Sequence, residues 1–145
     1  MTVRWPESTT FARPRKRGPR KRTIGKRAAP ERAIQVAIVK ALRQHCKFVW
    51  FAVPNGGKRH IHTAIKMKAE GVRAGTPDLV FVLPQGRAAF LELKSEEGRL
   101  SDAQIQFRQE VQALCAYWAV AHSIDEAWGI LAAWGCLPSE VEKVA

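Results

Sequence analysis

Glu92 and Lys94 stand two positions apart at the end of the apolar run GRAAFLELK (86–94). A strand repeats every two residues, so both side chains are expected on one face, next to Phe90. A carboxylate and an amine placed in this way can form a structural ion pair, or they can belong to a metal-dependent active site. The choice depends on which other charged groups lie nearby.

A second carboxylate is expected beside this pair. Asp78 opens the apolar segment 78–84, and residues 85–86 are turn formers that precede the strand-like segment 88–94. The two segments therefore predict a hairpin, which brings Asp78 level with the end of FLELK.

A third carboxylate belongs to the first predicted helix. Glu31 precedes Ile34 by three residues and Ile38 by seven, so it is expected on the apolar face and pointing inward. Two carboxylates about 4 Å apart repel by roughly 4 kcal/mol at an effective dielectric constant near 20. Because one lysine cannot offset three acids, the cluster predicts a divalent cation, and hard oxygen ligands favour Mg²⁺ or Mn²⁺ over zinc. Such an ion, with Lys94 holding a water beside it, is typical of phosphodiester hydrolysis.

The elements that must position these groups alternate along the chain. Apolar periodicity predicts a helix that starts after Pro30, and Ser101 with Gln104 forms a capping-box pattern ahead of another helix. The order is α-β-α-β-β-α-β-α, which predicts an α/β fold with a mixed central sheet flanked by helices. The segment 78–84 is almost continuously apolar, so it is expected to be central and covered on both faces. The predicted segments are helix 31–45, strand 47–53, helix 61–70, strands 78–84 and 88–94, helix 102–115, strand 117–122 and a last helix that ends at Gly135.

The net charge of +11 over 145 residues is concentrated at the N-terminus, where residues 1–30 hold ten of the 24 Lys and Arg and one acid. We expect residues 1–29 to be a disordered basic arm and residues 30–145 to be the folded domain. Such an arm binds the phosphates of nucleic acids, and a solubilising tail or a localisation signal is the alternative. The expected DNA contacts in the arm are Arg15, Lys16, Arg17, Arg20, Lys21 and Arg22.

Further contacts with phosphates are expected near the acidic cluster. The segment PNGGKRH (54–60) reads as a turn, either a plain one or one that approaches DNA through Asn55, Gly56, Gly57, Lys58 and Arg59. Arg73 and Arg99 flank the expected site, and each is either a DNA contact or simply exposed.

No apolar run approaches the roughly 18 residues of a membrane span, and the basic N-terminus has no apolar signal core. The three cysteines form no CxxC pair, and their odd number argues against a disulfide framework. These features favour a reduced intracellular protein with no membrane partner.

The motifs together carry a resemblance to a known family. Pro77-Asp78 followed by Glu92-Leu93-Lys94 resembles the PD-(D/E)xK nuclease signature. Glu31 together with PNGG, GVRAGTPDLV, FLELK and GRLSDAQIQF extends the match, in order, over about residues 31–122. This wider pattern resembles the VRR-NUC family of virus-type replication and repair nucleases, in the small stand-alone form of phages and bacteria.

The resemblance implies a restriction-endonuclease-like core and a role for each matching residue. Asp78, Glu92 and the main-chain carbonyl of Leu93 would ligate Mg²⁺ or Mn²⁺, and Glu31 would complete the cluster, through water. Lys94 would orient the attacking water and help to activate it. Gln104 would assist near the scissile phosphate, although the capping box alone also accounts for a glutamine there.

The same resemblance implies a homodimer that cuts branched DNA, as Holliday-junction resolvases do, in replication, recombination or repair. The expected location is the cytoplasm of a bacterial or phage-infected cell, in association with the nucleoid. Two other classes remain open, which are a non-cleaving nucleic-acid-binding module with the same fold and a basic RNA-associated structural protein.

Overall fold

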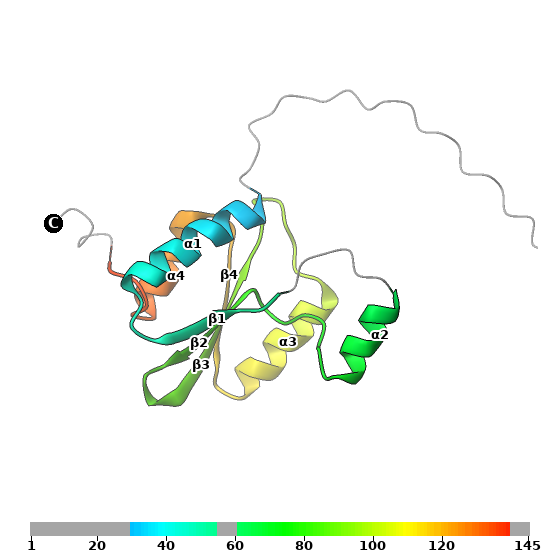
Figure 1. The fold of residues 1–145 in the computed structure, drawn as a ribbon. Coiled ribbons are helices and arrows are strands. Elements are labelled where there is room, and N and C mark those ends of the chain that lie inside the picture. Colours follow the sequence, from blue (N-terminus) through cyan, green and yellow to red (C-terminus); the bar gives the residue numbers. More distant parts are fainter. Residues whose placement is uncertain (1–29, 55–60, 140–145) are drawn as a thin grey trace, which may run out of the picture.

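The computed structural model describes residues 30–54 and 61–139 (Figure 1). The basic arm 1–29 and the segment 55–60 therefore lie outside the described residues. The predicted α/β order is confirmed. The elements are α1 (Glu31–His45), β1 (Val49–Ala52), α2 (Ile61–Ala69), β2 (Leu79–Leu83), a 3-10 turn η1 (Pro84–Gly86), β3 (Arg87–Leu93), α3 (Asp102–Ala113), β4 (Tyr117–Ala121) and α4 (Ile124–Ala133).

The four strands form one mixed sheet in the order β1-β2-β3-β4. β1, β2 and β3 are antiparallel neighbours, whereas β3 and β4 are parallel and are joined through α3. The predicted hairpin is the pair β2–β3, with Leu79 opposite Leu91. This register places Asp78, the residue before β2, level with Glu92.

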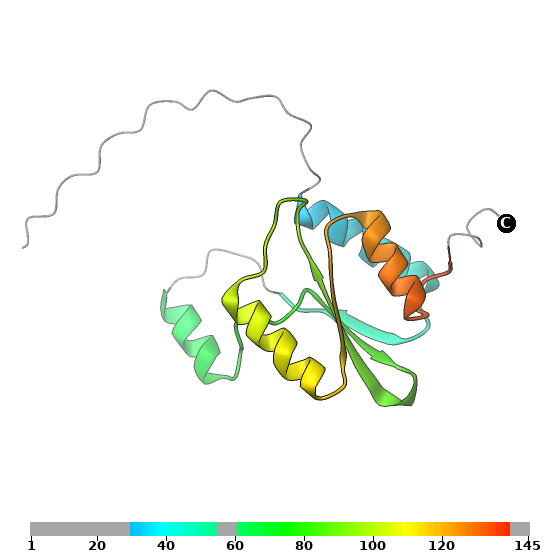
Figure 2. The same ribbon diagram turned by 180° about the vertical axis from the view of Figure 1, so that it is seen from behind.

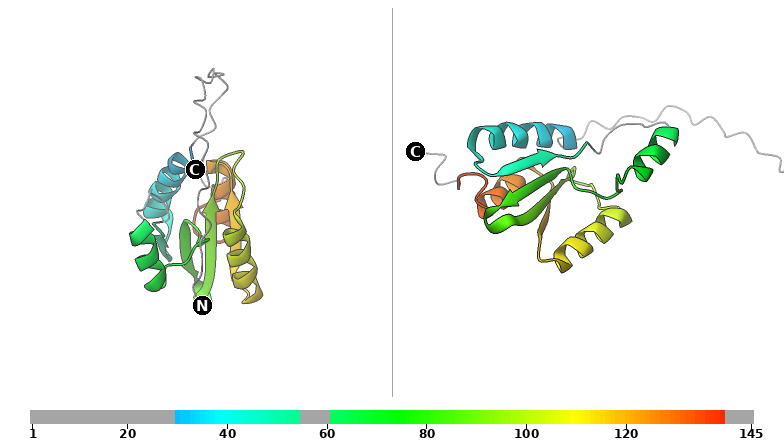
Figure 3. Two further views of the ribbon diagram at one scale, coloured as in Figure 1. Left: turned by 90° about the vertical axis from the view of Figure 1, so that its right-hand side faces the viewer. Right: turned by 60° about the horizontal axis from the view of Figure 1, so that its bottom comes forward.

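Helices lie on both sides of the sheet, with α1 and α4 on one side and α3 on the other (Figures 1 and 2). The right-hand view of Figure 3 shows α1 above the sheet and α3 below it. Side chains from α1, α4 and the inward face of the strands form the core, which includes Ile34, Ile38, Leu42, Leu79, Phe81, Leu91, Leu93 and Leu131. No helix within residues 30–54 and 61–139 is long and apolar enough to cross a membrane.

The expectation that β2 is covered on both faces is wrong. β2 is central and its Leu79, Phe81 and Leu83 are buried, but Val82 on the opposite face is 45% exposed. Phe107 of α3 packs edge-on against Phe90 of β3, so α3 covers the β3–β4 half of that face. The β1–β2 half keeps apolar side chains at the surface, and Val49, the partner of Val82, is 67% exposed.

Helix starts follow the predicted caps. Ser101 caps α3 by accepting from the main-chain N–H of Gln104, and the Gln104 side chain accepts in return from the N–H of Ser101. Ser123 likewise caps α4 by accepting from the N–H of Glu126. The start of α3 is therefore fixed by side chains that stand close to the end of β3.

The loop between α2 and β2 is pressed against the start of α3. Gly75 has a φ of +82°, and a Cβ atom there would lie 2.2 Å from the main-chain oxygen of Ala103. Only glycine fits this conformation and this contact. Because Asp78 follows three residues later, the contact also constrains the position of Asp78 just before β2.

We predict that Gly75→Ala lowers the free energy of unfolding by roughly 3 kcal/mol, through the positive φ and the clash with α3. The matched control is Gly71→Ala, which has a φ of +89° but nothing within 4 Å of its Cβ. The control should lose only about 1–2 kcal/mol, the cost of the backbone conformation. Urea denaturation measures both variants, and equal losses would show that the contact with Ala103 does not constrain the loop.

Candidate active site

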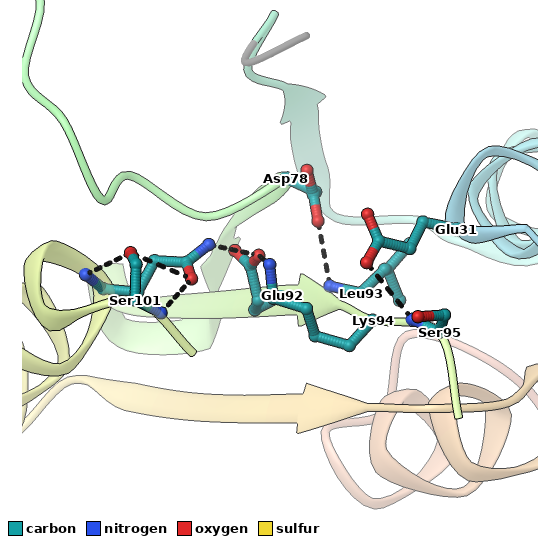
Figure 4. Close-up of polar contacts among 8 residues, drawn as sticks. Glu31, Asp78, Glu92, Leu93, Lys94, Ser95 and Ser101 are labelled. Atoms are coloured by element: carbon teal, nitrogen blue, oxygen red, sulfur yellow. Dashed lines mark hydrogen bonds and ion pairs between the residues drawn. The ribbon is translucent and has the colours of Figure 1, made fainter. Parts of the chain in front are cut away.

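Glu92 is the one charged residue of the described ranges that is buried, with 3% of its surface exposed. Its Oε1 atom lies 2.8 Å from the Lys94 ammonium and also accepts a hydrogen bond from the Gln104 side-chain amide. Figure 4 shows Glu92 and Lys94 along the end of β3. The period of the strand places Glu92 and Lys94 on one face, as predicted from their spacing.

The second carboxylate oxygen of Glu92 has no such partners. Oε2 is buried and accepts no hydrogen bond from any described residue. A buried carboxylate oxygen without a donor or a cation is costly, and most buried polar atoms in proteins are paired. Oε2 of Glu92 is therefore the atom of the site that still needs a hydrogen-bond donor or a cation.

Asp78 lies across from Glu92 at the start of β2. Its Oδ2 atom accepts a hydrogen bond of 2.9 Å from the main-chain N–H of Leu93. In the β2–β3 register the residue opposite Leu93 is Pro77, which has no N–H to donate to a carbonyl group. The proline thus ends the antiparallel ladder, and the Asp78 carboxylate meets the main chain of β3 in its place.

Glu31 reaches the site from α1. Its position on the helix predicted a side chain that points into the core, but Glu31 is exposed. Its Oε1 atom accepts a hydrogen bond of 3.3 Å from the main-chain N–H of Ser95. In Figure 4, Glu31 and Ser95 lie at the end of β3 away from Ser101. The reason is that Glu31 is the first residue of α1, where the helix extends past the core to the edge of the site.

Gln104 combines the two roles that the sequence left open. Its Oε1 atom completes the capping box of α3 by accepting from Ser101, and its amide nitrogen donates to Glu92. The oxygen and the nitrogen of the Gln104 side-chain amide therefore hold the start of α3 and the Glu92 carboxylate, respectively.

Burial dominates the electrostatics of the two carboxylates. It raises the pKa of Glu92, against the hydrogen bond from Lys94, and it raises the pKa of Asp78, against the hydrogen bond from Leu93. Burial of Lys94 works to lower its pKa, but the hydrogen bond and charge of Glu92, with the charges of Glu31 and Asp78, raise it above its ordinary value. In the metal-free site these charges therefore favour the ammonium form of Lys94.

The donor set suits a small divalent cation bound with few protein ligands. No group of three His, Cys, Asp or Glu side chains in residues 30–54 and 61–139 is arranged to hold a metal ion. Mg²⁺ is often bound by one or two carboxylates and keeps several waters. The partnerless oxygen of Glu92 and the carboxylate of Asp78 fit that description, with Glu31 at the edge of the site.

Of the other residues predicted to contact DNA, the structure describes Arg73 and Arg99. Arg73 pairs with Glu110 at 2.7 Å and lies over the ring of Phe107, so its charge is partly neutralised by α3. Arg99 is exposed in the loop after β3. The predicted contacts in segment 54–60, Asn55, Gly56, Gly57, Lys58 and Arg59, lie outside the described residues, as do those of the arm, Arg15, Lys16, Arg17, Arg20, Lys21 and Arg22.

Sequence reasoning missed Ser95 as a member of the site. It takes part through its main-chain N–H, which any residue except proline offers, so no residue type marks the position.

Comparison with known proteins gives consistent results. A model of the VRR-NUC domain family matches residues 28–124. A solved structure named as a VRR_NUC domain protein superposes with a TM-score of 0.63 at 21% identity, covering 77% of this chain and 93% of that one. A second, named as a VRR_NUC domain, has a TM-score of 0.48 at 18% identity, covering 71% and 95%. No curated protein matches the chain.

The raised pKa of Asp78 predicts how stability depends on pH in the absence of metal. Below its ordinary value of 3.8, the carboxyl group is protonated in both the folded and the unfolded chain. As the pH rises, the unfolded chain loses this proton first, so folding becomes less favourable until the raised pKa is passed. Asp78→Asn keeps an oxygen acceptor without the charge, so its free energy of unfolding should exceed that of the parent at pH 7 and match it near pH 3.

Urea denaturation in EDTA at several pH values measures this difference. Glu97→Gln, which changes an exposed acid in the loop after β3, is the control and should follow the parent at every pH. A difference between Asp78→Asn and the parent that does not change with pH would contradict the effect of burial on Asp78.

Proposed function

Because the chain belongs to the VRR-NUC domain family, a family of nuclease domains, we propose that it is a Mg²⁺- or Mn²⁺-dependent DNA endonuclease. The observation that carries the proposal is the Glu92 carboxylate, which is buried with one oxygen doubly held and the other without a partner. A structural ion pair accounts for Oε1 and leaves Oε2 unexplained. A cation-binding carboxylate accounts for both oxygens.

Asp78, Glu92 and the main-chain carbonyl of Leu93 would hold the ion, and Glu31 would contribute through water. The Leu93 carbonyl is a suitable ligand because Pro77, opposite it in the register, has no N–H to offer. A bound divalent ion supplies polarisation of a phosphoryl oxygen and a lower pKa for a water ligand.

Lys94 would position the attacking water and compensate negative charge that develops on the phosphate. An ammonium group 2.8 Å from Glu92 is placed to donate hydrogen bonds to the water and to the phosphate oxygens. The water oxygen would form a bond to phosphorus as the bond from phosphorus to the leaving oxygen breaks, with the proton of the water passing to solvent and the leaving oxygen taking up a proton from solvent. Gln104 would act as a positioning residue that fixes the orientation of Glu92.

Branched DNA is the proposed substrate and a homodimer the proposed assembly, with a role in replication, recombination or repair. Symmetric cutting of a four-way junction needs two sites related by a two-fold axis. Val49, Phe51 and Val82 are 67%, 52% and 45% exposed on the uncovered β1–β2 face, which supports a contact between two copies. The basic arm, with a net charge of +9 over residues 1–30, would add contacts with DNA phosphates.

We predict that the protein cuts DNA only with a divalent ion and that Lys94→Ala lowers the cutting rate by at least about a hundredfold, because the phosphate loses its charge compensation. DNA binding should remain nearly intact. The measurement is a cleavage panel of four-way junction, flap, nicked duplex and intact duplex in Mg²⁺, Mn²⁺ and EDTA, with binding followed by fluorescence anisotropy.

Lys40→Ala, which removes an exposed lysine on α1, is the control and should cut like the parent. Cutting by Lys94→Ala at the rate of the parent would show the mechanism to be wrong. Binding without cutting by the parent in every ion would instead favour a non-cleaving module, and a preference for RNA with indifference to Mg²⁺ would favour an RNA-associated protein.

A further inference from the structure

A cavity of about 740 Å³ opens beside the candidate site, between α2, the loop 71–76 and the start of α3. Ser101 and Gln104 form one wall, and the amide of Gln104 is hydrogen-bonded to Glu92. The cavity and the buried carboxylate are thus separated by a single side chain. The volume lies within the range of about 300–1,000 Å³ that is usual for small-molecule sites.

The lining of the cavity is mostly apolar. Ala64 and Met67 of α2 and Val72 and Ala74 of the loop supply aliphatic surface, and Val72 is 45% exposed. Such walls suit the face of a flat ring better than they suit a phosphate, which needs polar partners all round.

Two positively charged side chains, those of Arg73 and Lys68, line the cavity, and they differ in their ion pairs. Arg73 is paired with Glu110 at 2.7 Å. Lys68 also lines the cavity, is exposed, and forms no ion pair with another residue of the described ranges. One lysine beside a mostly apolar cavity complements a group that carries a single negative phosphate next to a flat ring.

We propose that this cavity receives one unpaired nucleotide of the DNA strand, next to the phosphate that is cut. The base lies against the aliphatic walls and its phosphate lies near Lys68. This inference rests on the proposed nuclease function and narrows its substrate class, because a base must leave the helical stack to enter a concave site. That step costs a few kcal/mol in a duplex and least for a base that is already unpaired. The protein therefore selects DNA with an unpaired nucleotide at the cutting position over continuous duplex.

The test compares the affinity for two DNAs of equal length, one with a short single-stranded flap and one a continuous duplex, by fluorescence anisotropy in EDTA. The full-length parent should bind the flap about tenfold more tightly. Ala64→Phe fills the cavity from α2, so it should bring the ratio of the two affinities to about one without changing the affinity for duplex.

Ala69→Phe is the matched control, since it makes the same change on the same helix at an exposed position that does not line the cavity. It should keep the ratio of the parent. Val72→Trp, which fills the cavity from the loop, is the second variant in case Ala64→Phe does not fold, and it should behave like Ala64→Phe. A 2-aminopurine base at the unpaired position should brighten on binding the parent, because no aromatic side chain of the described residues lines the cavity to quench it.

Equal affinity of the parent for both DNAs, or an unchanged ratio in a folded cavity-filling variant, would overturn the inference. These outcomes are separate from failure of the proposed function. A parent that prefers flap DNA in EDTA but never cuts it with Mn²⁺ would refute the nuclease and leave the nucleotide site in place. A parent that cuts, with variants that keep its preference, would refute only the nucleotide site.

Discussion

The burial of one carboxylate, Glu92, is the constraint on which the rest of the site depends. Removing an ionised carboxylate from water costs several kcal/mol unless it gains partners. β3 places Glu92 under α3 with 3% of its surface exposed, and Lys94 and Gln104 both bind its Oε1 atom. The other oxygen has no partner among the described residues. The fold therefore holds a carboxylate in a fixed orientation at an energetic cost, which is a common property of functional sites.

The elements around Glu92 are joined by few but specific contacts. Gln104 links the cap of α3 to Glu92, and Asp78 links the start of β2 to the main chain of β3. Gly75 packs against the main chain of α3, so the loop that leads into β2 is held against the start of that helix. A change in any of these contacts alters the geometry of the carboxylates even though the altered residue is not itself a ligand. Rigid support of this kind is what a site for oriented phosphodiester chemistry requires.

Local patterns in the sequence predicted much of this arrangement. The two-residue period of FLELK and the turn before it are sufficient to place Asp78, Glu92 and Lys94 together, and the capping box is sufficient to start α3 at Ser101. The exposure of Glu31, the open face of β1 and β2, and the bond between Gln104 and Glu92 were not predicted. Each depends on how far a helix extends over the sheet, and the spacing of residues within one segment carries no information about that distance.

The central claim is that the buried carboxylate of Glu92, together with Asp78, binds a divalent cation. Calorimetric titration of the metal-free protein with Mn²⁺ tests this claim without any DNA. We expect the parent to bind the ion and both Asp78→Asn and Glu92→Gln to lose that binding while remaining folded. A parent that takes up no Mn²⁺, or variants that bind it as the parent does, would contradict the claim.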